Sequence, residues 1–151
     1  MSKKLGSSEA ADTCTFQPNE ADGRPMVDDS DPADVKPVLF TIYGPGTKQF
    51  RAAKARVESR AINRMRTRGK VDITPEESAR NNAEFLADIT KSIDNAEYGE
   101  GLTGRDMYVA MYTDTKLGFL AEQVSEKCGD WANFSKGSVT TSASTSGSLP
   151  G

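Results

Sequence analysis

The apolar positions of the chain follow two different periods, which divide it into a β-rich first third and a helical remainder. Residues 13–16 alternate polar and apolar side chains, as a short strand does, and an Asp-Gly pair further along favours a turn. Residues 24–27 are compatible with the start of a second strand. The strongest strand signal covers 37–43, which is β-branched and aromatic and ends at a Gly-Pro-Gly sequence. We therefore expect a small antiparallel hairpin or meander over 13–43, which needs helices to cover one face.

Helical periodicity begins directly after that Gly-Pro-Gly sequence and predicts about four helices. The first starts at Thr47 as its N-cap and runs to about Arg68, where Gly69 stops it. Its apolar side chains recur at spacings of three and four, which predicts one narrow stripe toward the core: Phe50, Ala53, Val57, Ala61 and Met65.

The second helix has a strong start signal. Thr74 is its N-cap, Pro75 occupies the first helical position, and Glu77 completes a capping box. We expect this helix to end near Asn95. Its core-facing stripe consists of Ala79, Ala83, Leu86, Ile89 or Thr90, and Ile93.

Two further helices are predicted in the last third of the chain. Thr103 is a candidate N-cap for the third helix, and the fourth covers 117–128 and stops at Gly129. Trp131 and Phe134 then follow, and we expect them to form a final aromatic anchor.

Together these elements predict an α+β, mainly α fold. A single small domain is expected over 13–136, with a β-hairpin region at 13–43 and a helical region at 47–136. Residues 1–12 are small and polar, and 137–151 form an uncharged Ser/Thr/Gly-rich segment of low complexity. We expect both ends to be disordered tails.

The composition of the 151 residues excludes several classes of chemistry. There is no His, which excludes Ser-His-Asp catalysis, Cys-His catalysis and every metal motif that contains His. Cys14 and Cys128 cannot form a four-thiolate site and are too few for a disulfide framework, while a bond between them is neither indicated nor excluded. No run of about 18 apolar residues suggests a membrane span, and no signal peptide is evident. We expect a soluble, non-enzymatic protein without cofactor or metal.

The net charge of −3 conceals three blocks of opposite sign. Residues 1–36 hold four basic and eight acidic groups, a net of −4. Residues 37–70 hold nine basic groups and one acidic residue, Glu58, a net of +8. Residues 71–136 hold six basic and thirteen acidic groups, a net of −7. Such asymmetry indicates either a binding surface or the pairing of segments within the molecule.

The basic first helix is the strongest functional signal. It could bind a phosphate backbone, but the acidic remainder and a pI near 5.1 argue against nucleic acid. Packing beside the acidic second helix, or docking to an acidic partner, is favoured. The third helix carries Met and Tyr side chains. Such side chains can make adaptable contacts with a partner, although packing in the core is the commoner explanation for them. The candidate partner-binding residues are Lys48, Arg51, Lys54, Arg56, Arg60, Arg64, Arg68, Met107, Tyr108, Met111, Trp131 and Phe134.

Two motifs resemble ligand loops without meeting their requirements. The sequence from Gly44 to Lys48 leads a strand through glycines into a helix, but it lacks the spacing of a P-loop. The acidic residues of 28–34 lack the Gly and the bidentate Glu of an EF-hand, which favours a solvated loop.

The order of the segments resembles the tail assembly chaperones of long-tailed, siphovirus-type bacteriophages over about 13–136. The segments that carry this resemblance are DGRPMVDD, FTIYGPGTKQFRAAKARVESR, FLADITKSI, GLTGRDMYVAMYTDTKLGFLAEQV and GDWANF.

That resemblance implies a non-enzymatic protein of the host cell cytoplasm, which binds the tape measure protein and recruits tail tube subunits during tail assembly. The uncharged C-terminal segment would suit the end of a short form or a linker to a frameshifted extension. A structural minor tail protein of the virion is the nearest alternative, and self-association is possible in either role. A small nucleic-acid-binding regulator that uses residues 47–68 is the alternative from another class.

Overall fold

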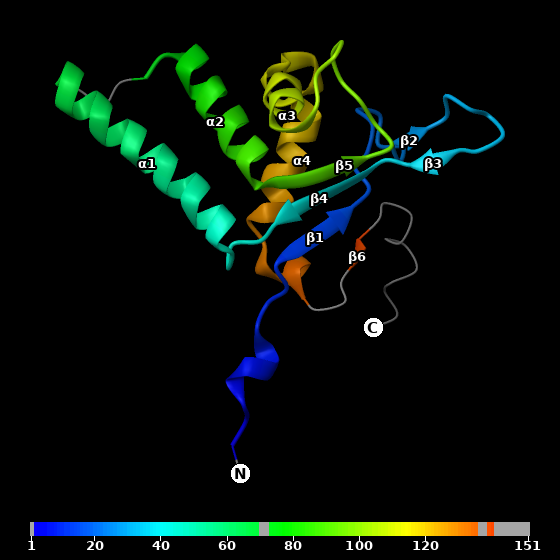
Figure 1. The fold of residues 1–151 in the computed structure, drawn as a ribbon, viewed down its shortest axis with the longest axis horizontal. Helices are drawn as coiled ribbons and strands as arrows, with labels where there is room; N and C mark the ends of the chain where they lie inside the picture. The colour runs from blue at the N-terminus through cyan, green and yellow to red at the C-terminus, as the bar shows by residue number, and fades with distance from the viewer. Residues whose placement is uncertain (1, 70–72, 136–138, 141–151) are drawn as a thin grey trace.

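The computed structural model describes residues 2–69, 73–135 and 139–140, and it has the expected α+β, mainly α architecture (Figure 1). The 3₁₀ helices are η1 (Leu5–Ser8), η2 (Thr115–Leu117) and η3 (Trp131–Phe134). The strands are β1 (Thr13–Phe16), β2 (Val27–Asp28), β3 (Lys36–Pro37), β4 (Leu39–Tyr43), β5 (Thr90–Asp94) and β6 (Val139–Thr140). The α-helices are α1 (Lys48–Arg68), α2 (Pro75–Ile89), α3 (Gly104–Thr113) and α4 (Gly118–Cys128).

The main sheet has the strand order β5-β4-β1-β6. The two predicted strands at 13–16 and 37–43 are neighbours in it, since β1 and β4 pair antiparallel with Phe16 opposite Phe40. The strand predicted at 24–27 begins later, as β2, and pairs with β3 in a separate two-stranded sheet. β4 therefore lies in the interior of the main sheet, and its end leads through the Gly-Pro-Gly turn into α1 (Figure 1).

The prediction that the second helix extends to about Asn95 is wrong. α2 ends at Ile89, and the next five residues form β5, which pairs antiparallel with β4. Thr90 makes the transition: its hydroxyl donates to the Leu86 carbonyl oxygen at 2.7 Å and lies 2.8 Å from the Tyr112 hydroxyl. Ile93 therefore lies in the sheet opposite Phe40 instead of on the helix stripe. Pairing with a distant strand outweighs the helical pattern here.

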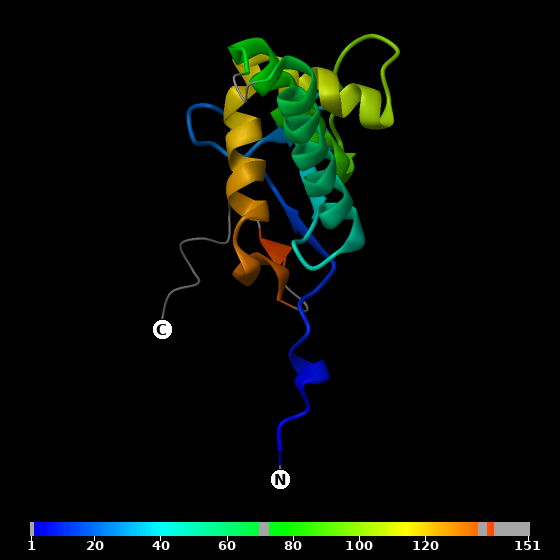
Figure 2. The same cartoon turned by 90° about the vertical axis from the view of Figure 1, so that its left-hand side faces the viewer.

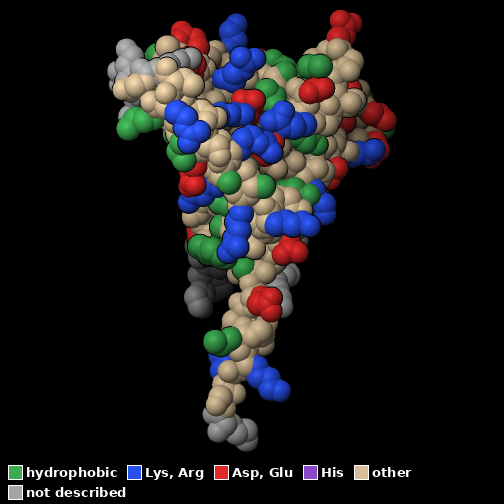
Figure 3. All heavy atoms as spheres, turned by 60° about the vertical axis from the view of Figure 1, so that its left-hand side comes forward, with side chains coloured by type: hydrophobic (Ala, Val, Ile, Leu, Met, Phe, Trp, Pro, Cys, Tyr) green, Lys and Arg blue, Asp and Glu red, His purple; other side chains and the backbone are tan. Residues whose placement is uncertain are grey.

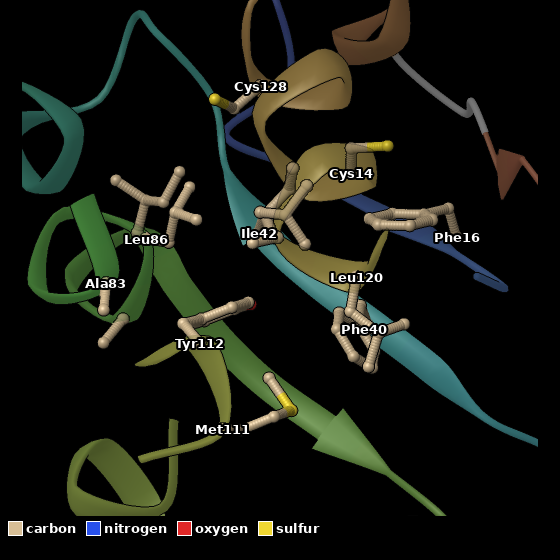
Figure 4. Close-up of a cluster of buried hydrophobic side chains, with 14 of the residues drawn as sticks. Cys14, Phe16, Phe40, Ile42, Ala83, Leu86, Met111, Tyr112, Leu120 and Cys128 are labelled. Atoms are coloured by element: carbon tan, nitrogen blue, oxygen red, sulfur yellow. The ribbon is translucent and has the colours of Figure 1, made fainter. Parts of the chain in front are cut away.

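The core lies on one face of the main sheet, where α2, α3 and α4 cover it (Figures 1 and 2). Along β1 and β4 buried side chains alternate with partly exposed ones, as expected for a strand with one covered face. Figure 4 shows the buried side chains of the strands and helices meeting in one cluster, among them Cys14, Phe16, Phe40, Ile42, Leu86, Tyr112 and Leu120.

α1 is the outermost helix, with α2 between it and α3 (Figures 1 and 2). Its predicted caps are confirmed: the Thr47 hydroxyl accepts from the Phe50 amide at 3.2 Å, and Gly69 has a left-handed φ of 69°. Near its start, Phe50 meets the edge of Phe85 at a ring-centroid distance of 5.5 Å. The predicted apolar stripe then fails toward the C-terminal end, where Met65 is 56% exposed. The apolar stripe of α1 is therefore covered near the start of the helix and exposed at Met65.

Each of the two predicted tails includes residues that the structure describes. Residues 1–12 include η1, and the Ala11 amide donates to the Phe134 carbonyl oxygen at 2.6 Å. The backbone of β6 pairs in parallel with β1, and the rest of the predicted tail at 137–151 lies outside the described residues. Within the described part of the chain, no helix has the length and apolar character needed to cross a membrane.

Candidate functional site

The basic charge of α1 is partly neutralised by α2, which runs antiparallel beside it. Arg60 Nη1 lies 3.0 Å from Glu84 Oε2 and donates to Asn81 Oδ1 at 3.1 Å. Closer to the sheet, Arg56 pairs with Asp88. For these two arginines, pairing within the molecule is the correct interpretation of the charge pattern.

Asp88 connects three helices. Its carboxylate accepts from Arg56 of α1 and, at 2.8 Å, from Nε of Arg105 of α3. The Asp88 side chain is 12% exposed, whereas the two arginines are about half exposed. The hydrogen bond that Arg105 donates to Asp88 is the largest influence that raises the pKa of Arg105. The base of α1 is thereby fixed to the helical layer.

The other basic side chains of α1 form no ion pair with the described residues. Figure 3 shows Lys and Arg side chains gathered on this side of the molecule. Arg68, also predicted as a partner-binding residue, has a side chain outside the described part. The unpaired cations of α1 are Lys48, Arg51, Lys54, Arg64 and Arg66.

A groove of about 380 Å³ lies between α1 and α2. On α1, the lining residues are Lys54, Val57 and Arg64, which are three and seven positions apart. On α2, the lining residues between Ser78 and Phe85 recur at spacings that place them on one face of the helix. The lining residues are Lys54, Val57, Arg64, Ile73, Ser78, Asn81, Asn82 and Phe85.

The floor of this groove is apolar, and its rim is polar or cationic. Val57 and Phe85 are half-buried, and Ile73 is 37% exposed just before α2 begins. Lys54 and Arg64 stand on the α1 side. An apolar floor with cations beside it suits an amphipathic segment whose polar side chains are acidic.

Arg64 is the unusual member of the groove. Its Nε is buried and has no hydrogen-bond partner among the described residues. A buried donor without an acceptor costs about 1–3 kcal/mol, so such groups are rare in folded proteins. The sequence pattern shows Arg64 as one of several arginines, and the fold alone distinguishes it.

Several predicted partner-binding residues do not reach this surface. Met107 and Met111 are 7% and 5% exposed, and Phe134 is fully buried, so core packing accounts for all three side chains. Tyr108 is half-buried against the core. Trp131 is 58% exposed, so it is no buried anchor, and its ring lies beside Gly46 in the turn before α1.

Sequence reasoning missed the apolar residues at the outer end of α1 and before α2. Ile62 is 58% exposed although it lies within a helix, and Ile73 lines the groove. In the sequence, Ile62 is surrounded by basic residues, so it does not stand out as an exposed apolar residue. Had residues 62–65 been considered a solvent-exposed face, Ile62 and Met65 would have been recognised as an apolar pair among arginines.

The two thiols and the acidic loop have local structural environments. Burial raises the pKa of the Cys14 and Cys128 thiols, and both are free. In the acidic loop, the Ser30 hydroxyl and amide both donate to Asp28, which lowers the pKa of Asp28. No group of three or more acidic or sulfur ligands that could hold a metal occurs among the described residues.

The Gly-Pro-Gly sequence makes a strand-to-helix turn. The Thr47 hydroxyl donates to the Gly44 carbonyl oxygen at 2.8 Å and accepts from the Phe50 amide, which leaves the hydroxyl committed to the turn. No family model, curated protein or solved structure matches the chain. We therefore infer function from the groove, the charge of α1 and the sequence resemblance.

Proposed function

We propose that the chain is a non-catalytic tail assembly chaperone of a long-tailed bacteriophage, which acts in the host cytoplasm. It binds the tape measure protein through the α1–α2 surface and recruits tail tube subunits. One observation carries the proposal: α1 presents exposed apolar side chains, Ile62 and Met65, together with cations such as Lys54 and Arg64 that form no ion pair with the described residues.

The physical character of this surface supports a binding role with release. The groove is shallow and bordered by cations, so electrostatic attraction speeds encounter while the buried apolar area stays small. A chaperone that leaves its client during assembly needs both fast association and a small buried apolar interface. Such binding weakens as salt screens the exposed charges.

Two of the segments that carry the resemblance contact each other. The turn of FTIYGPG packs on the closing GDWANF: a side-chain carbon at Gly44 would lie 2.6 Å from the ring of Phe134. The N-terminal arm joins the same place, since the Ala11 amide donates to Phe134. The turn before α1 therefore packs against η3 and the N-terminal arm.

Co-expression with the tape measure protein of the same genome tests the proposal. We expect the tape measure protein to become soluble and to co-purify with the tagged chain, and the yield to fall as the salt of the wash rises. An unrelated acidic helical protein, expressed in the same way, serves as the control. Tape measure protein that stays insoluble, or that elutes alone at low salt, would contradict the proposal.

Mass spectrometry of purified virions separates a chaperone from a structural minor tail protein. The chaperone is expected to be absent from finished particles, while tail tube and tape measure peptides are abundant. Stoichiometric amounts of this chain in the virion would replace the chaperone role by the structural one.

A further inference from the structure

We propose that the α1–α2 groove binds an amphipathic helix that carries carboxylates beside its apolar stripe. The apolar side chains of this partner helix lie on Val57, Ile73 and Phe85, and one carboxylate pairs with Arg64. This inference rests on the proposed function and names the chemistry of the partner segment.

The spacing of the lining residues on α1 and α2 matches the dimensions of a helix docked in the groove. On α1, Lys54, Val57 and Arg64 lie on one face at i, i+3 and i+10, and Lys54 and Arg64 are about 15 Å apart along the axis. On α2, Ser78 and Phe85 mark the two ends of a seven-residue repeat. A helix of about three turns matches this length, with apolar anchors at the i, i+3, i+4 and i+7 positions of the helix-in-groove mode.

The apolar floor explains why the occupant is amphipathic. Phe85 and Val57 keep part of their surface exposed, and Ile73 is 37% exposed with no described element over it. Covering these side chains removes apolar surface from water at about 25 cal/mol per Å². A purely polar or phosphate-rich ligand gains nothing from this floor.

Charge complementarity explains why the occupant is acidic. Arg56 and Arg60 already have carboxylate partners in α2, whereas Lys54 and Arg64 have none among the described residues. Arg64 lines the groove, and a carboxylate pairs with a guanidinium through two parallel hydrogen bonds. An acidic side chain of the partner would thus neutralise a groove cation that has no ion-pair partner among the described residues.

Display selection on the full chain tests the partner's chemistry. The probe is a library of 18-residue helical peptides with a fixed Leu stripe and with Glu, Lys or Gln allowed at each flanking position. We expect enriched sequences to carry Glu beside the stripe, at two positions about ten residues apart. Enrichment of Lys, of uncharged sequences, or of nothing would overturn the proposal.

Matched variants then locate the enriched peptide by fluorescence anisotropy. Arg64→Gln is expected to weaken binding about tenfold and Ile73→Ser by a similar factor, because each removes one anchor. Arg51→Gln and Ile62→Ser make the same changes on α1 outside the groove, and their affinities should stay within about twofold of wild type. Equal losses in both pairs would place the peptide elsewhere on α1 and sink the inference.

Two further measurements keep the inference independent of folding and of the proposed function. Arg64→Gln leaves the melting temperature unchanged or higher, since Arg64 Nε has no acceptor to lose. Tape measure protein that co-purifies equally with Arg64→Gln would uphold the chaperone role and refute this site. An enriched acidic peptide without tape measure binding would do the reverse. Arg64-dependent binding of duplex DNA, without any acidic peptide, would overturn the inference.

Discussion

Replacing Gly44 with Ala is expected to destabilise the protein, because the turn before α1 packs directly on an aromatic ring. A side-chain carbon at this position would lie 2.6, 2.9 and 3.0 Å from Cδ1, Cγ and Cε1 of Phe134. Phe134 is fully buried, so its ring cannot move into solvent to make room. Overpacking of this kind costs typically about 1–3 kcal/mol, and we expect about 2 kcal/mol for Gly44→Ala.

Urea denaturation followed by far-UV circular dichroism measures this loss. With a slope of about 2 kcal/mol per M, the midpoint falls by about 1 M while the slope stays unchanged. Gly118→Ala is the matched control: apart from its chain neighbours and its own helix backbone, no described heavy atom lies within 4 Å of the added carbon, so we expect no loss of stability there.

A double-mutant cycle identifies the cause of the Gly44→Ala effect. Phe134→Leu removes the ring, so its combination with Gly44→Ala should cost less than the sum of the single changes. Strict additivity would mean that the two residues do not touch in solution. A Gly44→Ala variant with the wild-type midpoint would refute the packing of turn on ring altogether.

Three further outcomes follow from the structure. Asp88→Ala leaves two half-exposed arginines without their shared carboxylate and should lower the free energy of unfolding by about 1–3 kcal/mol, whereas an unchanged urea midpoint would contradict the three-helix connection. Burial raises the pKa of Cys14 and Cys128, so both should react slowly with a thiol reagent at about pH 8 until denaturant is added; rapid labelling of the folded protein would count against it. The hydrogen bond that the Tyr98 hydroxyl donates lowers the pKa of Asp114. This bond therefore stabilises the folded protein above the ordinary pKa of 3.8, and the stabilisation is lost as the pH falls through the lower folded pKa. Tyr98→Phe should therefore destabilise at neutral pH and match wild type in acid; a pH-independent difference would argue against this.

The helix starts could be predicted because their signals are local. Thr47 and Thr74 each accept the amide three residues ahead, as their sequences indicate. β5 could not be predicted in this way, because Thr90–Asp94 pairs with a strand some fifty residues earlier in the chain. The local pattern cannot show where the helix ends and the strand begins, because the strand forms only through its pairing with β4.

The site was predicted in part. The charge pattern led to α1, but it could not say which cations α2 neutralises, since that depends on how the two helices face each other. Arg60 meets Glu84, while Arg64 one turn later meets no acceptor among the described residues. For Met107 and Met111 the sequence could not distinguish a helix face that packs in the core from one that contacts a partner, and the structure buries both side chains.

The place of β4 in the sheet has a mechanical consequence for α1. β4 is hydrogen-bonded to β1 on one side and β5 on the other, and it continues through a tight turn into α1. A load applied to α1 therefore reaches the interior strand directly, and that strand can slide only if both ladders break together. A pull on α1 is therefore resisted by two strand ladders at once.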